Sequence, residues 1–281
     1  MRFYNVMRLA TALLCLAAAL PASAETLRVM SFNVRYAAKS DGPDIWENRR
    51  DFLVETIRKH NPDLIGTQEL LYVQGQYIDQ AMPEYKWFGV SRRGNQEDEH
   101  MGVFYRTDRL TLVDSGNYWL SLTPERAGSS AWNMSLPRMA TWGMFEIKAT
   151  GQKFLFTNTH FAHRREDDHA RRMSARVIAN RLALYEETLP LVVTGDFNAP
   201  AEGGAYETMT AVMKDAWTSA VKKSGPEGTF HGFKGTPGAA RIDWILYRAP
   251  WKVLEAHTLT DNRDGRYPSD HFPILAVFEL P

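Results

Sequence analysis

The sequence has 281 residues, of which 44% are hydrophobic and 12% aromatic, a composition typical of a folded domain with a sizeable core. Its 33 basic and 33 acidic residues give a formal charge of zero, which disfavours a general binder of duplex nucleic acid. The single cysteine, Cys15, lies in the leader described next, so the rest of the chain has no thiolate for a metal site or for nucleophilic attack. Any metal must be bound by oxygen and imidazole.

The first 24 residues have the pattern of a cleavable secretory leader. A positively charged start precedes an apolar stretch at residues 9–20, and Ala22-Ser23-Ala24 forms a small-residue cleavage signal. The apolar stretch is too short for a comfortable membrane span, so a retained anchor is the less favoured alternative. We therefore expect a periplasmic or secreted mature protein, residues 25–281, without stable membrane insertion.

The mature chain alternates strand and helix patterns and contains no repeats or obvious linker. Amphipathic helical patterns cover residues 45–60, which Asn61-Pro62 ends, and residues 166–184. Some neighbouring strands look like hairpins, so the strand directions should be mixed. These patterns predict one α/β domain with packed sheets covered by helices. The strand-like runs lie at residues 27–32, 64–67, 101–105, 142–147, 154–159, 191–194, 242–247 and 272–280.

Six strands begin or end in a short polar segment. Taken singly, each has an ordinary explanation, because a charged residue after a strand is usually solvated. Six such explanations together are improbable, so the segments indicate a common site. They are Ser31-Phe32-Asn33, Thr67-Gln68-Glu69, Thr159-His160, Gly195-Asp196-Phe197-Asn198, Arg241-Ile242-Asp243-Trp244-Ile245 and Ser269-Asp270-His271.

The residue types in the first, second and fourth of these segments suit metal binding and water activation. Asn33 and Glu69 offer oxygen ligands for a hard cation such as Mg²⁺, Mn²⁺ or Ca²⁺. Asp196 and Asn198 would point to one side of an extended chain, where the carboxylate could deprotonate a water and the amide could contact a phosphoryl oxygen. An Asx turn is an equally reasonable interpretation of this pair.

The histidine-containing segments add groups for proton transfer and for charge neutralisation. Asp243 lies in an otherwise apolar strand, where a carboxylate needs a partner, and an imidazole is the natural one. Asp270 and His271 are adjacent and therefore face different ways, so one could reach metal and the other substrate. His160 is at a strand mouth, where a structural role is the commoner one. The remaining histidines of the mature chain that we considered are interpreted as surface or packing residues: His60, His163, His169, His231 and His257.

The six segments resemble the motifs of the endonuclease/exonuclease/phosphatase superfamily, in family order and over nearly the whole mature chain. The resemblance implies a four-layer α/β sandwich in which two packed mixed sheets are flanked by helices, with the site at one end. It implies Glu69 as the principal metal ligand, assisted by Asn33 and Asp270. The remaining roles implied are Asp196 as the water-orienting base, Asn198, His160 and His271 as phosphate contacts, Asp243 as the partner of one histidine, and Arg138 as an arginine near the site.

One position departs from the repair endonucleases of this superfamily. They have an acidic residue two positions after the asparagine, where this chain has Arg35, and this argues against a repair enzyme. Residues 41–50, 114–121 and 264–273 look like an uncharacterised secreted bacterial branch. Among the arginines in or near predicted loops, which include Arg49 and Arg92, we favour Arg263 and Arg266 as substrate contacts. Nearby aromatic residues could stack on a ligand, although core packing or bracing of loops is the favoured role for each: Trp46, Tyr118, Trp119, Trp132 and Trp142.

The sequence therefore predicts a metal-dependent hydrolase of phosphate mono- or diesters, with Mg²⁺ favoured over Mn²⁺ and Ca²⁺. The expected substrate is a small or single-stranded phosphate compound rather than duplex DNA, and no obligate protein partner is evident. A substrate-binding protein on the same scaffold is the alternative, but all six segments are intact. A glycosidase would leave the imidazoles and the amide of Asn198 without a role.

Overall fold

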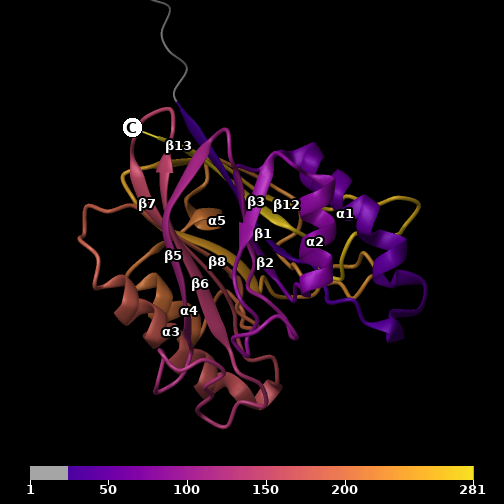
Figure 1. The fold of residues 1–281 in the computed structure, drawn as a ribbon, viewed down its shortest axis with the longest axis horizontal. Coiled ribbons are helices and arrows are strands. Elements are labelled where there is room, and N and C mark those ends of the chain that lie inside the picture. Colours follow the sequence, from indigo (N-terminus) through magenta and orange to yellow (C-terminus); the bar gives the residue numbers. More distant parts are fainter. Residues whose placement is uncertain (1–24, 281) are drawn as a thin grey trace, which may run out of the picture.

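The computed structural model describes residues 25–280, so the predicted leader at residues 1–24 lies outside the described residues. Two β-sheets dominate the architecture (Figure 1). One sheet has seven strands in the order β10 (Lys222–Ser224), β12 (Lys252–Thr258), β13 (Ile274–Glu279), β1 (Thr26–Asn33), β2 (Leu64–Gln68), β4 (Val103–Arg106) and β3 (Tyr85–Phe88). The other has six strands in the order β5 (Leu110–Trp119), β6 (Met139–Ile147), β7 (Lys153–His160), β8 (Leu191–Asp196), β11 (Asp243–Arg248) and β9 (Lys214–Asp215).

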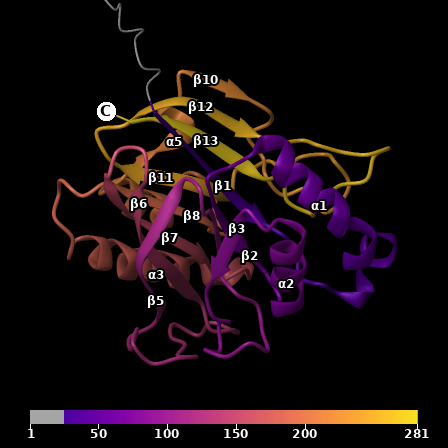
Figure 2. The ribbon, with the colours of Figure 1, turned by 45° about the horizontal axis from the view of Figure 1, so that its top comes forward.

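Helices cover the outer faces of both sheets, as Figures 1 and 2 show for α1, α2 and α3. On the seven-stranded sheet, Leu53 of α1 and Ile78 of α2 pack into one apolar cluster with Phe104. On the six-stranded sheet, Ile178 of α3 packs into another cluster with Val193. The helices are α1 (Trp46–His60), α2 (Tyr72–Ala81), α3 (Asp168–Leu182), α4 (Gly204–Thr210) and α5 (Ala216–Ser219), with short 3-10 helices η1 (Lys39–Asp44) and η2 (Arg165–Asp167).

The inner faces of the two sheets form a third apolar cluster. Val29 and Phe278 of one sheet meet Phe156 and Val192 of the other, and all four are fully buried. Each sheet is mixed, because β1 pairs parallel with β2 but antiparallel with β13, and β7 pairs parallel with β8, which is antiparallel to β11. The predicted α/β sandwich of two mixed sheets flanked by helices is therefore confirmed.

The eight predicted strands and two predicted helices are all present, with ends that shift by a few residues. Several further elements were not predicted, among them α2, β3 and β12. Strand β12 carries a bulge between Val253 and Glu255, which breaks the alternation by which strands are identified. Helix α2 contains Gly75, where a Cβ atom would lie 2.6 Å from the ring of Trp87, so close packing takes precedence over helix propensity.

Strand register brings the polar strand ends to one edge of the sandwich. In the six-stranded sheet, Asp196 is the register partner of both His160 and Asp243. In the seven-stranded sheet, Asn33 is opposite Gln68, so Glu69 leaves the sheet beside Asn33. Neighbouring strands of each sheet therefore place their functional residues at the same level along the sheet.

Arg49 of α1 fixes the chain segments around this edge. Its buried guanidinium donates to the carbonyl oxygens of Val34 at 2.6 Å, Arg35 at 2.6 Å and Pro268 at 3.0 Å. Buried carbonyl groups need such partners. The loop arginine suggested by the sequence is thus a structural residue that joins the turn after β1 to the segment before β13.

None of the helices in the described part of the chain combines the length and the apolar character that a membrane span requires.

Candidate active site

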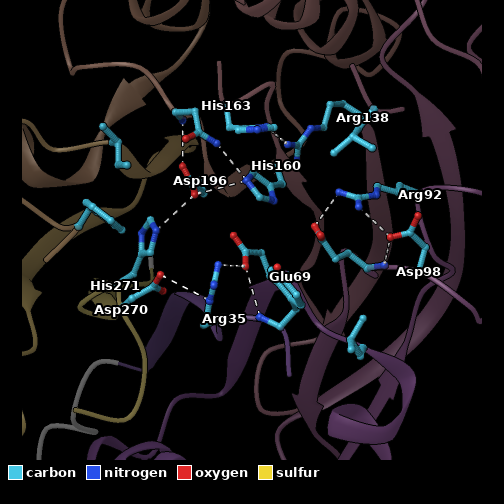
Figure 3. A pocket seen from close by; sticks show the side chains of 17 residues that line it. Arg35, Glu69, Arg92, Asp98, Arg138, His160, His163, Asp196, Asp270 and His271 are labelled. Carbon is cyan, nitrogen blue, oxygen red and sulfur yellow. Dashed lines mark hydrogen bonds and ion pairs between the residues drawn. The ribbon is translucent and has the colours of Figure 1, made fainter. Parts of the chain in front are cut away.

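A cavity of about 710 Å³ opens at the edge where the strand ends meet (Figure 3). Residues from both sheets line it. We call Asn33, Glu69 and Asp270, with Arg35, the carboxylate half, and His160, Asp196, Asn198, Asp243 and His271 the acid–base half. Of these nine residues, all but Asn33 and Asp243 line the cavity directly.

Asp196 lies at the centre of the acid–base half. Its Oδ1 accepts from the backbone N–H of Asn198 at 2.9 Å, which is the Asx turn considered for this pair. Its Oδ2 accepts from the amide of Asn33 at 3.0 Å and lies 3.5 Å from His160 Nε2 and 3.7 Å from His271 Nε2. Burial and the nearby charge of Asp243 raise the pKa of Asp196 to about 7. A buried carboxyl group with such a pKa suits proton transfer near neutral pH.

His271 is held by the carboxylate of Asp243. The distance from His271 Nδ1 to Asp243 Oδ2 is 2.9 Å, so Asp243 partners an imidazole as predicted. Burial by itself would lower the pKa of His271, but the charges of Asp243 and Asp196 outweigh it and raise this pKa to about 10. His271 is therefore positively charged at neutral pH, with its Nε2–H on the cavity side next to Asp196.

His160 and Asn198 form a second pair beside Asp196. The amide nitrogen of Asn198 donates to His160 Nε2 at 3.0 Å and to the carbonyl oxygen of Phe161 at 3.2 Å. Burial, and then the charge of Arg138, lower the pKa of His160 far enough to keep the ring neutral. The amide nitrogen of Asn198 is thus occupied within the protein, and its amide oxygen is left to face a ligand, whereas the sequence suggested a donor to phosphate.

Asn33 connects the two halves instead of facing the cavity. Its amide nitrogen donates to Glu69 Oε1 at 3.2 Å and to Asp196 Oδ2 at 3.0 Å, and its amide oxygen accepts from the backbone N–H of Arg35 at 3.0 Å. The reverse orientation of the amide would direct an oxygen at two carboxylates, so this network fixes it. In this position Asn33 holds Glu69, and its role as a metal ligand stays a prediction.

The two cavity-lining carboxylates of the carboxylate half flank the guanidinium of Arg35. Arg35 Nη1 lies 3.8 Å from Glu69 Oε2, and Arg35 Nε lies 3.9 Å from Asp270 Oδ2. Asp41 holds the guanidinium in place through bonds of 2.7 and 3.0 Å. Burial raises the pKa of Asp270, while the charges of His271 and Arg35 oppose the rise. Two carboxylates that line a cavity fit a hard cation that keeps several waters.

A geometric cluster of possible ligands also exists in the acid–base half. One ligand atom from each of Asp196, Asp243 and His271 lies within 4.8 Å of the others. However, His271 Nδ1 and the Oδ2 atom of Asp243 already pair with each other at 2.9 Å. This cluster therefore suits proton transfer, and Glu69 with Asp270 suit a metal.

Backbone strain marks the turns that leave the strands at this site. Arg35, Glu69 and Asn198 have φ angles of 52°, 59° and 47°, in the left-handed region that non-glycine residues avoid. Each such residue costs about 1–2 kcal/mol, and such strain is concentrated at functional sites. Without these turns, successive side chains would alternate between the faces of the sheet, as they do along a regular strand.

Arg138, near the start of β6, is buried at the cavity wall. Its Nη2 lies 3.0 Å from Nδ1 of His163, and among the described residues its Nε and Nη1 have no hydrogen-bond partner. Orphaned donors on a buried guanidinium are costly, so they indicate a site for an anionic or polar ligand. The structure brings Arg138 to the site, as the resemblance implied.

Arg263 and Arg266 are not brought to the cavity. Arg263 pairs with Glu55 of α1 and lies over the ring of Phe52, with its guanidinium carbon 4.8 Å from the ring centre. Arg266 donates to the carbonyl oxygen of Pro43 at 3.2 Å. Proximity to Asp270 in sequence was the basis for choosing these arginines. A turn at residues 263–266 directs them instead toward the outer helix and η1.

Sequence reasoning missed several charged residues that line the cavity. Arg35 was noted only as a departure from repair enzymes, and His163 was interpreted as a surface or packing residue. Arg92 was one of many loop arginines, and an acidic run from Glu97 to Glu99 looks like any solvated turn. Arg35 and His163 directly follow the ends of β1 and β7, so their nearness to the polar strand ends was a signal that could have identified them. Arg92 and the acidic run had no such signal, because the long loop between β3 and β4 brings them to the cavity. The additional lining residues are Arg35, Tyr36, Leu71, Arg92, Asp98, Glu99, Leu136, His163, Phe230 and Ile242.

Known proteins share both the sequence pattern and the fold. A family model described as "Endonuclease/Exonuclease/phosphatase family" matches residues 30–271. An endonuclease/exonuclease/phosphatase from Bacteroides vulgatus is 36% identical, with a TM-score of 0.86, covering 92% of this chain and 100% of that one. The mannosyl-6-phosphatase of Bacteroides thetaiotaomicron is 33% identical, with a TM-score of 0.85, covering 90% of this chain and 100% of that one.

A more distant likeness extends to a vertebrate protein. Human Nocturnin is 24% identical over 92% of this chain. The matched region is 67% of Nocturnin, so this chain spans about two thirds of that relative. The family match at residues 30–271 spans the six polar segments that form the cavity.

Proposed function

The chain belongs to the endonuclease/exonuclease/phosphatase family and is a hydrolase that acts on phosphate esters; we propose further that it is exported and that it depends on a divalent metal ion. The observation that best supports this proposal is the arrangement of side chains around Asp196. This buried carboxyl group lies between a charged and a neutral histidine, and Asn33 connects it to the carboxylate of Glu69.

Asp196 takes a proton from the attacking water in this proposal. Its pKa of about 7 is close to the value at which a base is both deprotonated and able to accept a proton. His271 stays charged through Asp243 and donates from Nε2 to a phosphoryl oxygen, where negative charge increases in the transition state. A new P–O bond forms to water and the P–O bond to the ester alcohol breaks. The leaving alkoxide takes a proton from solvent, and Asp196 returns to solvent the proton that it accepted.

Glu69 and Asp270 would hold the metal ion, with Asn33 orienting Glu69 through its amide nitrogen. Mg²⁺ is the favoured ion, because it binds proteins through one or two carboxylates and keeps several waters, and Mn²⁺ and Ca²⁺ are the alternatives. When bound, the ion polarises the phosphoryl group and offsets negative charge on the leaving oxygen. Arg35 balances the negative charge of both carboxylates from the opposite side.

The direct test uses the mature protein, residues 25–281, stripped of metal with a chelator. We expect hydrolysis of at least one phosphate ester to return on addition of Mg²⁺, Mn²⁺ or Ca²⁺, each tested separately, measured as phosphate release for monoesters and by product chromatography for diesters. The panel should contain sugar phosphates, inositol phosphates, phospholipids and single-stranded oligonucleotides. Equal turnover with and without metal would contradict metal dependence. Tight ligand binding without turnover would favour the alternative, a binding protein on this scaffold.

Export is proposed from the leader pattern at residues 1–24. Expression of the full chain in a bacterium, followed by cell fractionation and N-terminal sequencing, tests it. We expect a periplasmic or secreted product that begins at Glu25. Recovery of the uncleaved chain from the cytoplasm would contradict export without affecting the proposed chemistry.

A further inference from the structure

One wall of the cavity lies outside the proposed chemistry and consists of charged residues from the loop between β3 and β4. Arg92 Nη2 lies 2.9 Å from Asp98 Oδ1, and Arg92 Nη1 lies 2.9 Å from Glu99 Oε2 (Figure 3). The backbone N–H of Arg92 also donates to the carbonyl oxygen of Glu99 at 2.8 Å. We call these three residues the Arg92 clamp. All three line the cavity, and the Arg92 side chain is only 9% exposed.

The Arg92 clamp presents carboxyl groups, not a free guanidinium, to a ligand. Both terminal nitrogens of Arg92 are occupied by the carboxylates. Glu99 is engaged through Oε2, so Oε1 can accept from a ligand. Burial and the charge of Glu69 raise the pKa of Glu99 to about 7, although Arg92 opposes the rise. Carboxyl groups accept hydrogen bonds from hydroxyls and repel phosphate, so this wall disfavours a second phosphate or a nucleic-acid backbone.

Arg138 adds unpartnered donors close to this wall. It is 3% exposed, its Nε and Nη1 lack partners among the described residues, and its charge and that of Glu99 affect each other's pKa. His163, bound to Arg138 at 3.0 Å, lines the same side of the cavity. Acceptors and donors therefore converge here. A group with several hydroxyls matches both, because each hydroxyl can donate and accept.

The aromatic residues considered for base stacking do not line the cavity. Trp119 is buried, and its indole N–H donates to the carbonyl oxygen of Arg92 at 2.7 Å, so it braces the clamp from behind. The ring of Tyr36 is covered by the guanidinium of Arg35 at 4.5 Å. Phe230 also lines the cavity and is 43% exposed, but it lies at the phosphoryl end, against an imidazole of the acid–base half with ring centres 5.1 Å apart. Single-stranded nucleic acid is usually bound on aromatic platforms, and the Arg92 clamp has none, so the clamp favours a polar ligand over a base.

We propose that the Arg92 clamp is the subsite for an uncharged, polyhydroxylated leaving group, so that the substrate is a phosphate monoester of a polyol. This inference rests on the proposed function, because the clamp selects the alcohol that hydrolysis releases. The carboxyl groups of Glu99 and Asp98 accept from hydroxyls of the sugar or polyol, while the phosphoryl group lies at Asp196 and His271. The structurally similar mannosyl-6-phosphatase is named for a sugar phosphate, a substrate of this chemical class.

The test compares mannose 6-phosphate with phenyl phosphate, an ester without hydroxyls on its leaving group, both with Mg²⁺. We expect the wild-type protein to prefer mannose 6-phosphate in kcat/KM. Glu99→Gln should reduce this preference by about tenfold, mainly through KM, as loss of a charge-assisted hydrogen bond predicts. Asp98→Asn is the second variant, and a melting curve of each shows that it folds. Glu97→Gln is the matched control, because Glu97 is exposed in the same loop and does not line the cavity.

Three outcomes separate the inference from the function on which it rests. If a single-stranded oligonucleotide or phenyl phosphate is hydrolysed with higher kcat/KM than mannose 6-phosphate and other hexose and polyol phosphates, the inference is wrong and the proposed function stands. The inference is equally wrong if Glu99→Gln and Asp98→Asn fold but leave the preference unchanged. If no phosphate ester is hydrolysed with any of the three metals, the proposed function itself fails.

Discussion

The acid–base half and the carboxylate half of the cavity meet at one edge but are held in different ways. In the acid–base half, buried side chains contact one another directly. Asp196 lies within 3.5 Å of His160 and 3.7 Å of His271, and Asp243 holds His271 at 2.9 Å. These residues come from the ends of β7, β8 and β11 and from the segment before β13, so neighbouring strands fix their spacing.

In the carboxylate half, the two cavity-lining acids reach a shared guanidinium and not each other. Glu69 and Asp270 lie 3.8 and 3.9 Å from Arg35, whose strongest contacts are with Asp41. Like-charged carboxylates around one guanidinium remain open to a further cation. We therefore propose that the acid–base half keeps its geometry by itself and that a metal ion completes the carboxylate half. Changes in the first should affect the chemical step, and changes in the second should affect metal affinity.

The largest effect is expected for Glu69→Ala. Removing this carboxylate leaves Asp270 as the one cavity-facing acid of the carboxylate half, so we expect loss of metal-dependent turnover with the fold retained. Titration calorimetry with Mg²⁺ or Mn²⁺ should show metal affinity reduced by more than about tenfold, the scale seen when even an outer partner of a metal site is removed. Circular dichroism checks the fold. Unchanged activity, equal in stripped protein with and without Mg²⁺, would contradict the assignment of Glu69.

In the acid–base half, Asp196→Asn and His271→Ala should each reduce kcat by about a hundredfold or more. This is the range expected when a general base or a transition-state contact is removed. Metal affinity should change little, because neither side chain belongs to the carboxylate half. If the variants have kcat values near that of the wild type, these residues take no part in the chemical step. A large loss of metal affinity would instead erase the distinction between the halves.

A smaller effect is expected for Asp243→Asn, because Asp243 acts through His271 and does not line the cavity. Without the carboxylate, the charged imidazole loses its main stabilising partner. We expect kcat to fall by about 10–100-fold, as when the carboxylate partner of a functional histidine is removed, with KM and metal affinity less affected. Steady-state kinetics and calorimetry on the same sample measure both. An unchanged kcat would reduce Asp243 to a packing role.

Much of the fold and of both halves could be predicted, because the relevant signal is local. A buried apolar run followed by a polar residue, as at Val193 to Asp196, marks both the strand and its polar end. The orientation of the Asn33 side-chain amide could not be predicted from such a local pattern. Asn33 donates to two carboxylates because Glu69 and Asp196, 36 and 163 residues further along the chain, lie on either side of it. That contact exists only after the two sheets have packed.

The wall opposite the strand ends was beyond prediction for another reason. Asp98 and Glu99 lie in a polar loop whose sequence resembles any solvated turn. Their burial depends on Arg92, and the position of Arg92 depends on Trp119 of β5 in the other sheet. The aromatic residue was noticed in the sequence, but its role as a brace required the packing of two sheets.

The smallest effect is expected for an exposed arginine, Arg263, and it is best measured against a buried arginine, Arg138. Arg263 was favoured from sequence, yet its guanidinium pairs with Glu55 on the outer helix and is 55% exposed. Exposed ion pairs contribute little, so Arg263→Ala should change kcat and KM by less than about twofold. Arg138→Ala removes the same charge from a buried position with unpartnered donors, and we expect KM to rise by about tenfold or more. Parallel kinetics on both variants decide between them. A tenfold rise in KM for Arg263→Ala would mean that the loop at residues 263–266 moves onto the bound substrate, and the two halves would then not be the whole site.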